Sequence, residues 1–409
     1  MGKARNLSGV PSILGCLCLQ LCAGILYLWS VFKGPAIAYY GWADSAANLV
    51  ASFMLFSFCV GSLIGGTIQD RTGPRGVCIL GCVLLSGGIF LASLIPAGGA
   101  ILRFYLSYCL LGGLGCGFIY GSVISCMLKW MPHRRGLASG MAVSAFGLST
   151  VVFSPLSSRM LDFLSLPITF RRLSILFCAV GLAACGFIRL PDSNRPTSFP
   201  QPETEEENEH KNLGQAIRTA PFWYLFLTVF FINGTWNIAV PLIKGLGMAR
   251  GLSQGSALLT VSLTGLTSAA GRLSVAALSD RIGRTLSITL MAIVTMLCSV
   301  LLIFVEGHAY LLIILLAAFA YGGAAAIGPA ICTDLFGSRY SGRNFGVIML
   351  ALGLSSVVFN LVSNTLCAAA RTYTLSFVIG ALSAAVSIVL LKMMKHRSGR
   401  SRSAASMPG

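Results

Sequence analysis

Arg272 is the residue whose type and position are best suited to binding chemistry. It lies in residues 268–284 and is the only charged residue well inside an apolar segment. Eight residues later, at Asp280, the segment enters a charged turn. Eight helical residues rise roughly 12 Å and half a bilayer core is about 15 Å thick, so a spanning helix would place Arg272 near the membrane midplane. A guanidinium at that depth usually faces a cavity or a partner, whereas snorkelling to the surface is a property of helix ends. We therefore predict a binding site at Arg272.

The composition indicates the elements that position this residue. The 409 residues have a mean hydropathy of +0.82, and 56% are hydrophobic while only 10% are charged, which is too little charge for a soluble protein of this size. Twelve apolar segments are each long enough to span a membrane as a helix. They lie near residues 11–33, 46–69, 76–95, 103–128, 137–160, 171–190, 221–243, 255–279, 286–305, 309–332, 345–368 and 373–393. We predict an all-α membrane protein with twelve transmembrane helices.

The net charge of +17 would suit a nucleic-acid-binding protein, but its distribution predicts an orientation instead. Of the 29 basic residues, twenty fall on the side of the membrane that holds both termini, eight on the other, and Arg272 lies within a span. The positive-inside rule then places both termini in the cytoplasm of a cell-membrane protein. Contact with anionic lipid is expected, and contact with nucleic acid is not.

The fourteen cysteines lie mostly within spans and lack metal-ligand spacing with histidine, so we expect packing roles, no metal and no cofactor.

One long polar interval, residues 191–220, is rich in Pro, Glu and Asn and divides six spans from six. We predict that it is a cytoplasmic linker between bundles at 1–190 and 221–394, with a basic cytoplasmic tail at 395–409. Such a molecule needs no second copy, so we expect a monomer.

The two halves resemble each other. Residues 147–153 (GLSTVVF) and 353–359 (GLSSVVF) share six of seven positions and fall in the fifth and eleventh spans. The repeat predicts two pseudo-symmetric six-helix bundles, which can alternate access by rocking around a midplane site.

A charged turn recurs after the second and eighth spans at a constant offset of 210 residues. An aspartate with basic neighbours can hold a helix end and an interbundle salt bridge in one state and release them in another. We therefore predict a gating role for Asp70, Arg71, Arg75, Asp280, Arg281 and Arg284.

The first turn fits Gly-x-x-x-Asp-Arg-x-Gly-x-Arg and resembles the loop signature of the major facilitator superfamily. Residues 24–32, 130–140, 334–337 and 343–346 are similar to the oxalate/formate antiporter family, a branch with carboxylate substrates. The resemblance covers nearly the whole chain. It implies the major facilitator fold and a transport function.

The resemblance also implies a substrate site. In that family an arginine placed as Arg272 is placed binds a substrate carboxylate. Tyr27, Trp29 and Tyr120 match pocket aromatics of the family, and Tyr321 replaces a tryptophan. We add Asn237 as a polar group of the seventh span. Further candidates are Asn48, Asn233, Asn360 and Asn364.

The sequence differs at one position from the oxalate-transporting member of that family, and the difference affects the expected substrate. Leu352 stands where that transporter carries a lysine, so a second cation is absent. A guanidinium and a carboxylate form a planar bidentate pair, and one buried cation compensates one negative charge. Burying a dianion against it would cost several kcal/mol. We predict a monocarboxylate such as formate, lactate or pyruvate.

The positions of the acidic residues and histidines indicate whether transport is coupled to proton movement. None of the twelve Asp and Glu residues lies in mid-span, and the four histidines belong to loops or helix ends. Monocarboxylate–proton symporters carry an aspartate one turn before the arginine, and the sequence has Ser268 there. Exchange or facilitated transport is therefore favoured, although a proton can also travel on the substrate itself.

Other classes of function fit less well. The sequence has no buried Ser/His/Asp set, no His-Glu-x-x-His and no paired intramembrane aspartates, so we do not expect an enzyme. A non-transporting sensor on a transporter scaffold would keep the pocket, but it would usually add a signalling domain. Among transporters, the alternatives are exchange of a dicarboxylate such as oxalate for a monocarboxylate and transport of another organic anion.

Overall fold

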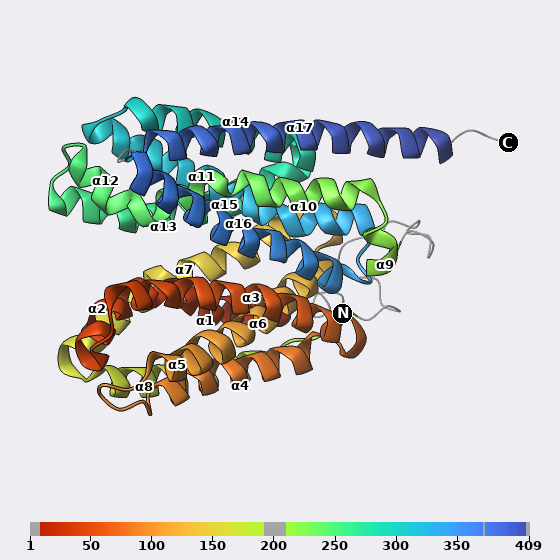
Figure 1. The fold of residues 1–409 in the computed structure, drawn as a ribbon. Coiled ribbons are helices and arrows are strands. Elements are labelled where there is room, and N and C mark those ends of the chain that lie inside the picture. The colour runs from red at the N-terminus through yellow and green to blue at the C-terminus, as the bar shows by residue number, and fades with distance from the viewer. Residues whose placement is uncertain (1–8, 192–209, 371–372, 406–409) are drawn as a thin grey trace. The chain divides into compact units, whose positions relative to one another are not determined.

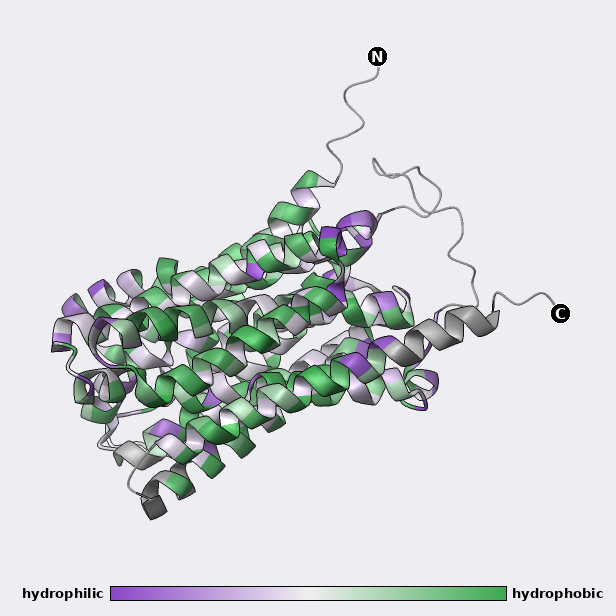
Figure 2. Cartoon of the chain, turned by 90° about the horizontal axis from the view of Figure 1, so that it is seen from above, coloured by the Kyte–Doolittle hydropathy of each residue, from purple (hydrophilic) through white to green (hydrophobic). Residues whose placement is uncertain are grey.

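The computed structural model describes residues 9–191, 210–370 and 373–405. All regular elements in these ranges are helical. Twelve helical stretches are long and apolar enough to cross a membrane, and each overlaps one of the twelve predicted spans. Apolar residues dominate these helices, and hydrophilic residues gather mainly at their ends (Figure 2). The predicted layout of an all-α protein with twelve transmembrane helices is confirmed.

The chain divides into two compact units. Unit 1 comprises Met1–His210 and Ser338–Leu350, and unit 2 comprises Lys211–Gly337 and Ala351–Gly409. The helices of unit 1 (Figure 1) are α1 (Val10–Ala23), η1 (Gly24–Leu28), α2 (Trp29–Tyr40), α3 (Asp44–Thr72), α4 (Pro74–Ala92), α5 (Ile101–Phe104), η2 (Tyr105–Gly112), α6 (Gly113–Trp130), η3 (Pro132–Arg134), α7 (Arg135–Phe163) and α8 (Leu166–Cys185).

The remaining helices belong to unit 2, except that the first ten residues of α16 are counted with unit 1. They are α9 (Leu213–Ala216), α10 (Ala220–Ile232), α11 (Gly234–Ala239), η5 (Val240–Leu242), α12 (Ile243–Ala249), α13 (Gln254–Ile282), α14 (Arg284–Phe304), α15 (Gly307–Phe336), α16 (Ser341–Ala370) and α17 (Thr374–Ala405). Within unit 2, α13 packs most extensively against α15, and α14 packs against α15 and α17.

The polar segments are only partly described. Most of the predicted linker, residues 192–209, lies outside the described residues, as do residues 406–409 of the predicted tail. The end of the linker folds into α9, where Asn212 and Gln215 form a reciprocal capping box, which satisfies two otherwise unpaired N–H groups. Helix α17 continues into the stretch expected to be a tail.

Three of the predicted spans are not uniform α-helices. The first changes to a 3-10 helix at η1, the fourth contains the π-helix η2, and the seventh is divided into α10 and α11 before η5. At η1, Gly24 lies so close to α7 that a β-carbon there would overlap the carbonyl oxygen of Phe146, and the position therefore requires glycine. In η5, Pro241 lacks the N–H that an α-helix needs. Such interruptions often mark functional positions in helices.

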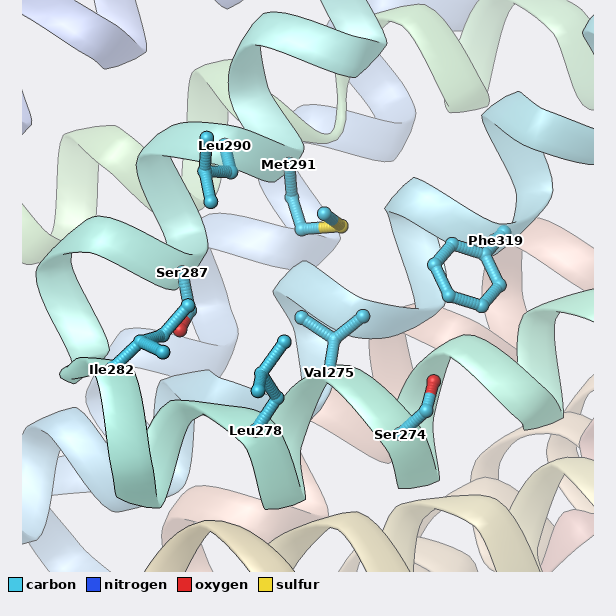
Figure 3. Close-up of a pocket in the computed structure, with 8 residues that line it drawn as sticks. All are labelled: Ser274, Val275, Leu278, Ile282, Ser287, Leu290, Met291 and Phe319. Carbon is cyan, nitrogen blue, oxygen red and sulfur yellow. The ribbon is translucent and has the colours of Figure 1, made fainter.

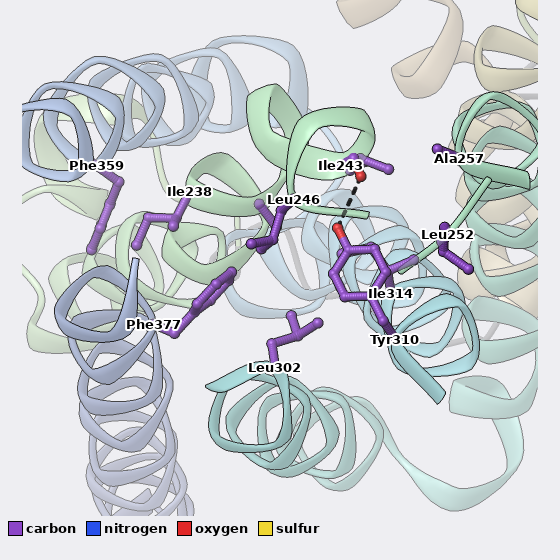
Figure 4. Packing of buried hydrophobic residues seen from close by; sticks show 11 residues of the cluster. Ile238, Ile243, Leu246, Leu252, Ala257, Leu302, Tyr310, Ile314, Phe359 and Phe377 are labelled. Atoms are coloured by element: carbon purple, nitrogen blue, oxygen red, sulfur yellow. Dashed lines mark hydrogen bonds between the residues drawn. The ribbon is translucent and has the colours of Figure 1, made fainter. Parts of the chain in front are cut away.

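A hydrophobic cluster holds the interrupted seventh span within unit 2 (Figure 4). It includes Ile243 and Leu246 of α12, Leu302 of α14 and Tyr310 of α15. The hydroxyl of Tyr310 donates a hydrogen bond to the carbonyl oxygen of Ile243 across 3.0 Å. This bond ties α15 to the start of α12.

Arg250, which follows α12, contacts Val305 at the end of α14 and Tyr310 of the cluster. Its guanidinium donates to the carbonyl oxygen of Val305 across 2.7 Å and lies 5.6 Å from the centroid of the Tyr310 ring. Burial lowers the pKa of the Arg250 guanidinium from its ordinary value.

Candidate functional site

Arg272 lies in α13 with a side chain that is 4% exposed. Among the side chains whose burial the structure describes, it is the only buried Asp, Glu, Lys or Arg. A guanidinium enclosed in an apolar bundle attracts an anion that enters the protein, because their attraction is strong where water is excluded.

Two glycines fix the height of Arg272 against α15. A β-carbon at Gly271 would overlap the carbonyl oxygen of Phe319, and one at Gly322 would overlap that of Ser268. The backbones of α13 and α15 therefore touch on both sides of this crossing, which is the role of small residues in membrane helix packing. The guanidinium is held by a rigid pair of helices.

Ser268 lies one helical turn before Arg272 and is 6% exposed. Its hydroxyl oxygen has no hydrogen-bond partner among the described residues. Residues four apart lie on the same face of a helix, so the hydroxyl and the guanidinium form a neighbouring pair of polar groups. An anion at Arg272 could use both as donors.

Tyr321 and Asn237, both predicted for the site, have defined partners in unit 2. The ring of Tyr321 in α15 stacks on that of Trp236 in α11, with centroids 5.2 Å apart and planes 20° from parallel. The side-chain amide of Asn237 donates to the hydroxyl of Ser355 in α16 across 3.0 Å. Trp236 and Ser355 were not predicted from the sequence. Two signals could have indicated them: Trp236 is adjacent to Asn237, and Ser355 lies in the internal repeat.

Tyr27 and Tyr120 are brought together in unit 1. Both contact the ring of Phe146, with centroid distances of 5.5 Å and 5.1 Å, and Tyr120 also contacts Phe58 at 5.0 Å. Tyr27 is 37% exposed and Tyr120 is 5% exposed. Phe146 and Phe58 were not predicted, since a single phenylalanine in an apolar span gives no signal of its own.

Trp29 belongs to a different aromatic cluster. It is 5% exposed and packs against Phe104 and Tyr108. Its indole N–H donates to the carbonyl oxygen of Ala47 across 2.9 Å, which joins α2 to α3. The indole N–H is therefore used within unit 1, and only the ring is available for the predicted contact with substrate.

Two of the further asparagine candidates bond to their own helices. The side-chain amide of Asn233 donates to the carbonyl oxygen of Val229 across 2.5 Å, and that of Asn360 donates to the carbonyl oxygen of Ser356 across 2.8 Å. The side chain of Asn364 lies outside the described residues.

The first predicted gating turn contacts the start of α16 within unit 1. The amide N–H of Arg343 donates to Oδ2 of Asp70 across 2.8 Å, and that of Gly342 donates to Oδ1 across 3.3 Å. A carboxylate at this place satisfies unpaired N–H groups and interacts favourably with the helix dipole. Asp70 is thus an N-terminal cap supplied by a distant part of the sequence.

A hydroxyl and amide chain lies beside this cap. The amide of Gln69 donates to the hydroxyl of Ser125 across 2.9 Å, and the hydroxyls of Ser125 and Ser341 are 2.8 Å apart. It ties α3, α6 and α16 together. These three residues were not predicted, because polar residues near helix ends are common in any membrane protein.

The second gating turn forms a charge network within unit 2. Arg284 lies 2.6 Å from Asp280 and donates from Nε to Asp334 across 3.0 Å. It also donates to the hydroxyl of Ser279 across 2.7 Å. The predicted pair of Asp280 and Arg284 is in direct contact. The remaining predicted gating residues, Arg71, Arg75 and Arg281, are exposed.

Within the described part of the chain, no group of three or more His, Cys, Asp or Glu side chains is arranged to hold a metal ion. The described cysteines are free thiols, and most of them are buried. The sulfur atoms of Cys82 and Cys185 are 3.9 Å apart.

Comparison with known proteins supports the fold and the transport class. The chain is 25% identical to the oxalate:formate antiporter of Oxalobacter formigenes, with 95% of this chain and 91% of that protein covered. It is 22% identical to apicoplast pyruvate carrier 1 of Toxoplasma gondii, covering 93% and 88% respectively. The crystal structure of the transporter FucP in the outward conformation superposes with a TM-score of 0.72 at 15% identity, covering 95% of this chain and 99% of FucP.

The sequence profile of the Major Facilitator Superfamily matches residues 14–359, which is most of the chain. This multi-pass membrane protein belongs to the Major Facilitator Superfamily of transporters.

Proposed function

We propose that this protein transports a small monocarboxylate, such as formate, lactate or pyruvate, across the cell membrane by alternating access. Transport occurs as exchange or as facilitated transport, and no catalytic step is involved. The observation that carries the proposal is the burial of Arg272, the only charged side chain among the described residues that is enclosed in the protein. A guanidinium binds a carboxylate through two parallel charge-assisted hydrogen bonds.

The number of buried cations supports a monoanion. Position 352 in α16 is a leucine, so only one cationic anchor is available among the described residues. A monocarboxylate would neutralise Arg272, whereas a dicarboxylate would leave a second charge buried without a counter-ion. That difference is worth several kcal/mol in a low-dielectric site.

The neighbours of the anchor support exchange or facilitated transport. No Asp, Glu or His side chain among the described residues is buried, and Ser268 stands one turn before Arg272. A proton relay needs a titratable group on the pathway. A serine hydroxyl can orient a carboxylate, but it does not store a proton at physiological pH.

Exchange of oxalate for formate is the second candidate. Its support is the likeness to the oxalate:formate antiporter, which extends over nine tenths of both chains. A single buried cation favours the monocarboxylate over this alternative.

The proposal extends to the bundles, the orientation in the membrane, the remaining site residues and the gates. We propose six-helix bundles at 1–190 and 221–394, both termini in the cytoplasm, and a monomer as the transporting unit. The aromatic rings of Tyr27, Trp29, Tyr120 and Tyr321, with Asn237, complete the binding site. The Asp70 cap and the Asp280–Arg284 pair act as gating contacts that form in one state and open in the other.

Counterflow in proteoliposomes tests the proposal. Vesicles loaded with unlabelled formate, lactate or pyruvate are placed in labelled formate, lactate, pyruvate or oxalate. We expect transient accumulation of a labelled monocarboxylate, loss of that accumulation in Arg272→Ala, and partial activity in Arg272→Lys, which keeps the charge but not the bidentate geometry. Equal accumulation of oxalate would refute the monocarboxylate assignment, and unaltered transport by Arg272→Ala would refute the anchor.

A further inference from the structure

An apolar groove runs between α13 and α14 on unit 2. It has a volume of about 270 Å³, and its apolar lining comes from Val275, Leu278, Ile282, Leu290, Met291 and Phe319 (Figure 3). Val275 is buried, whereas Leu278, Ile282 and Leu290 are 47%, 38% and 41% exposed. The groove therefore has a closed floor and a rim that lies on the outer surface of the helices.

The groove is lined by membrane-spanning helices, namely α13, α14 and, through Phe319, α15. Because its rim is apolar and exposed, we expect it to face the bilayer. An apolar recess offers water too few hydrogen-bonding partners, so hydrocarbon is the favoured occupant. The volume can accept a segment of an acyl chain, and filling it would restore the van der Waals contacts that the lining side chains otherwise lack.

A free positive charge lies at one end of the groove. Ser274, which also lines the groove, Leu278 and Arg281 are spaced i, i+4 and i+7, and so they share one face of α13. Arg281 is exposed, and no ion pair is found for it in the described ranges. Arg284, on the other side of the same turn, is held by Asp280 and Asp334.

We propose that this groove is a binding site for a bilayer phospholipid, with an acyl chain against the floor at Val275 and the phosphate at Arg281. Van der Waals contact with the groove walls holds the acyl chain, which gains no hydrophobic free energy because the bilayer already surrounds it with hydrocarbon. The guanidinium fixes the height of the headgroup through charge-assisted hydrogen bonds to phosphate. The bound lipid packs on α13, the helix that carries Arg272, and is distinct from any transported anion.

Photolabelling tests the site directly. The full-length protein is reconstituted with a trace of phosphatidylglycerol that carries a diazirine on one acyl chain, irradiated, and analysed by peptide mass spectrometry. We expect labelling concentrated in residues 274–291. A diazirine-bearing hydrocarbon without a phosphate should label the same residues more weakly, because it lacks the contact with Arg281.

Matched variants separate the groove from general lipid exposure. Leu290→Trp fills the groove, whereas Val300→Trp enlarges another residue of α14 that is also 41% exposed. We expect labelling of 274–291 to fall at least fivefold in the first and to be unchanged in the second. If Leu290→Trp does not fold by gel filtration, Leu278→Phe fills the same space.

The headgroup contact has its own control. Arg281→Gln should lower labelling about fivefold, since a basic residue near the membrane surface contributes about 1 kcal/mol to lipid binding. Arg71→Gln removes an exposed charge at the repeat-related position and should leave the labelling of residues 274–291 unchanged. Labelling spread evenly over all exposed spans, or labelling of 274–291 that persists in both groove-filling variants, would overturn the proposal.

Discussion

The main-chain N–H of Arg343 donates to the carboxylate of Asp70 across 2.8 Å, although the two residues are 273 positions apart in the sequence. The bond closes the first turn of α16 with a side chain from the end of α3. A helix start that depends on a distant carboxylate can open without unfolding any helix, which is a suitable property for a gate.

Removing the charge of this cap should weaken the contact. Asp70→Asn keeps an oxygen acceptor but loses the attraction to the helix dipole, so we expect the free energy of unfolding to fall by about 1 kcal/mol. Thermal unfolding in detergent measures this loss, and counterflow measures the change in rate. Asp162→Asn, an exposed carboxylate at the end of α7, is the control and should change neither quantity. An unchanged unfolding temperature in Asp70→Asn would exclude an energetic role for the cap.

The close crossing of α13 and α15 should tolerate no added methyl group. Gly271→Ala forces apart the backbones beside Arg272, at a cost of about 1–3 kcal/mol, and should abolish transport. Gly255→Ala is on the same helix, where a β-carbon meets no atom within 4 Å, and it should leave unfolding temperature and counterflow unchanged. Equal behaviour of the two variants would show that the crossing does not position the guanidinium.

An acid placed beside the anchor should make transport pH-dependent. In Ser268→Asp the new carboxylate lies one turn from Arg272, and when ionised it competes with the substrate for the guanidinium. Transport should be low at pH 7.5 and should recover as the pH falls and the new carboxylate is protonated. Counterflow between pH 5 and pH 7.5 measures the effect. Ser268→Asn, a neutral side chain of similar size, should show no such recovery, and a flat profile in Ser268→Asp would place the serine outside the site.

A second cation should shift the choice of anion. Leu352 is half-buried in α16, and Leu352→Lys would supply the charge that a dicarboxylate requires. We expect uptake of oxalate relative to formate to rise about tenfold, which corresponds to roughly 1.4 kcal/mol. Leu352→Met, uncharged and similar in length, should not alter the ratio. An oxalate to formate ratio that stays constant in the lysine variant would contradict the one-cation argument.

The sequence predicted the spans well because hydrophobicity is summed over some twenty residues and tolerates local exceptions. The changes of helix type at Gly24–Leu28 and Tyr105–Gly112 were missed for the same reason. Every residue of those segments is compatible with an apolar helix. Gly24 also packs against Phe146 of α7, a contact that no local pattern contains.

Some residues of the candidate site could be predicted from the sequence, and others could not. Arg272 was predictable because a charge in an apolar segment is rare and costly. The stacking of Tyr321 on Trp236 and the bond between Asn237 and Ser355 join segments about 85 and 118 positions apart. Partners at such separations are selected by tertiary packing, so single residues indicated their own polarity but not what they would contact.

The lone buried guanidinium also has a consequence for how membrane voltage acts on the carrier. With a monocarboxylate bound, the charge of Arg272 is cancelled and the loaded protein can reorient without moving net charge. The empty protein would move one positive charge through the electric field, at up to roughly 2.3 kcal/mol per 100 mV. Voltage therefore affects the return of the empty carrier and has almost no effect on one-for-one exchange. We expect that adding a monocarboxylate on the opposite side of the membrane reduces the voltage dependence of transport.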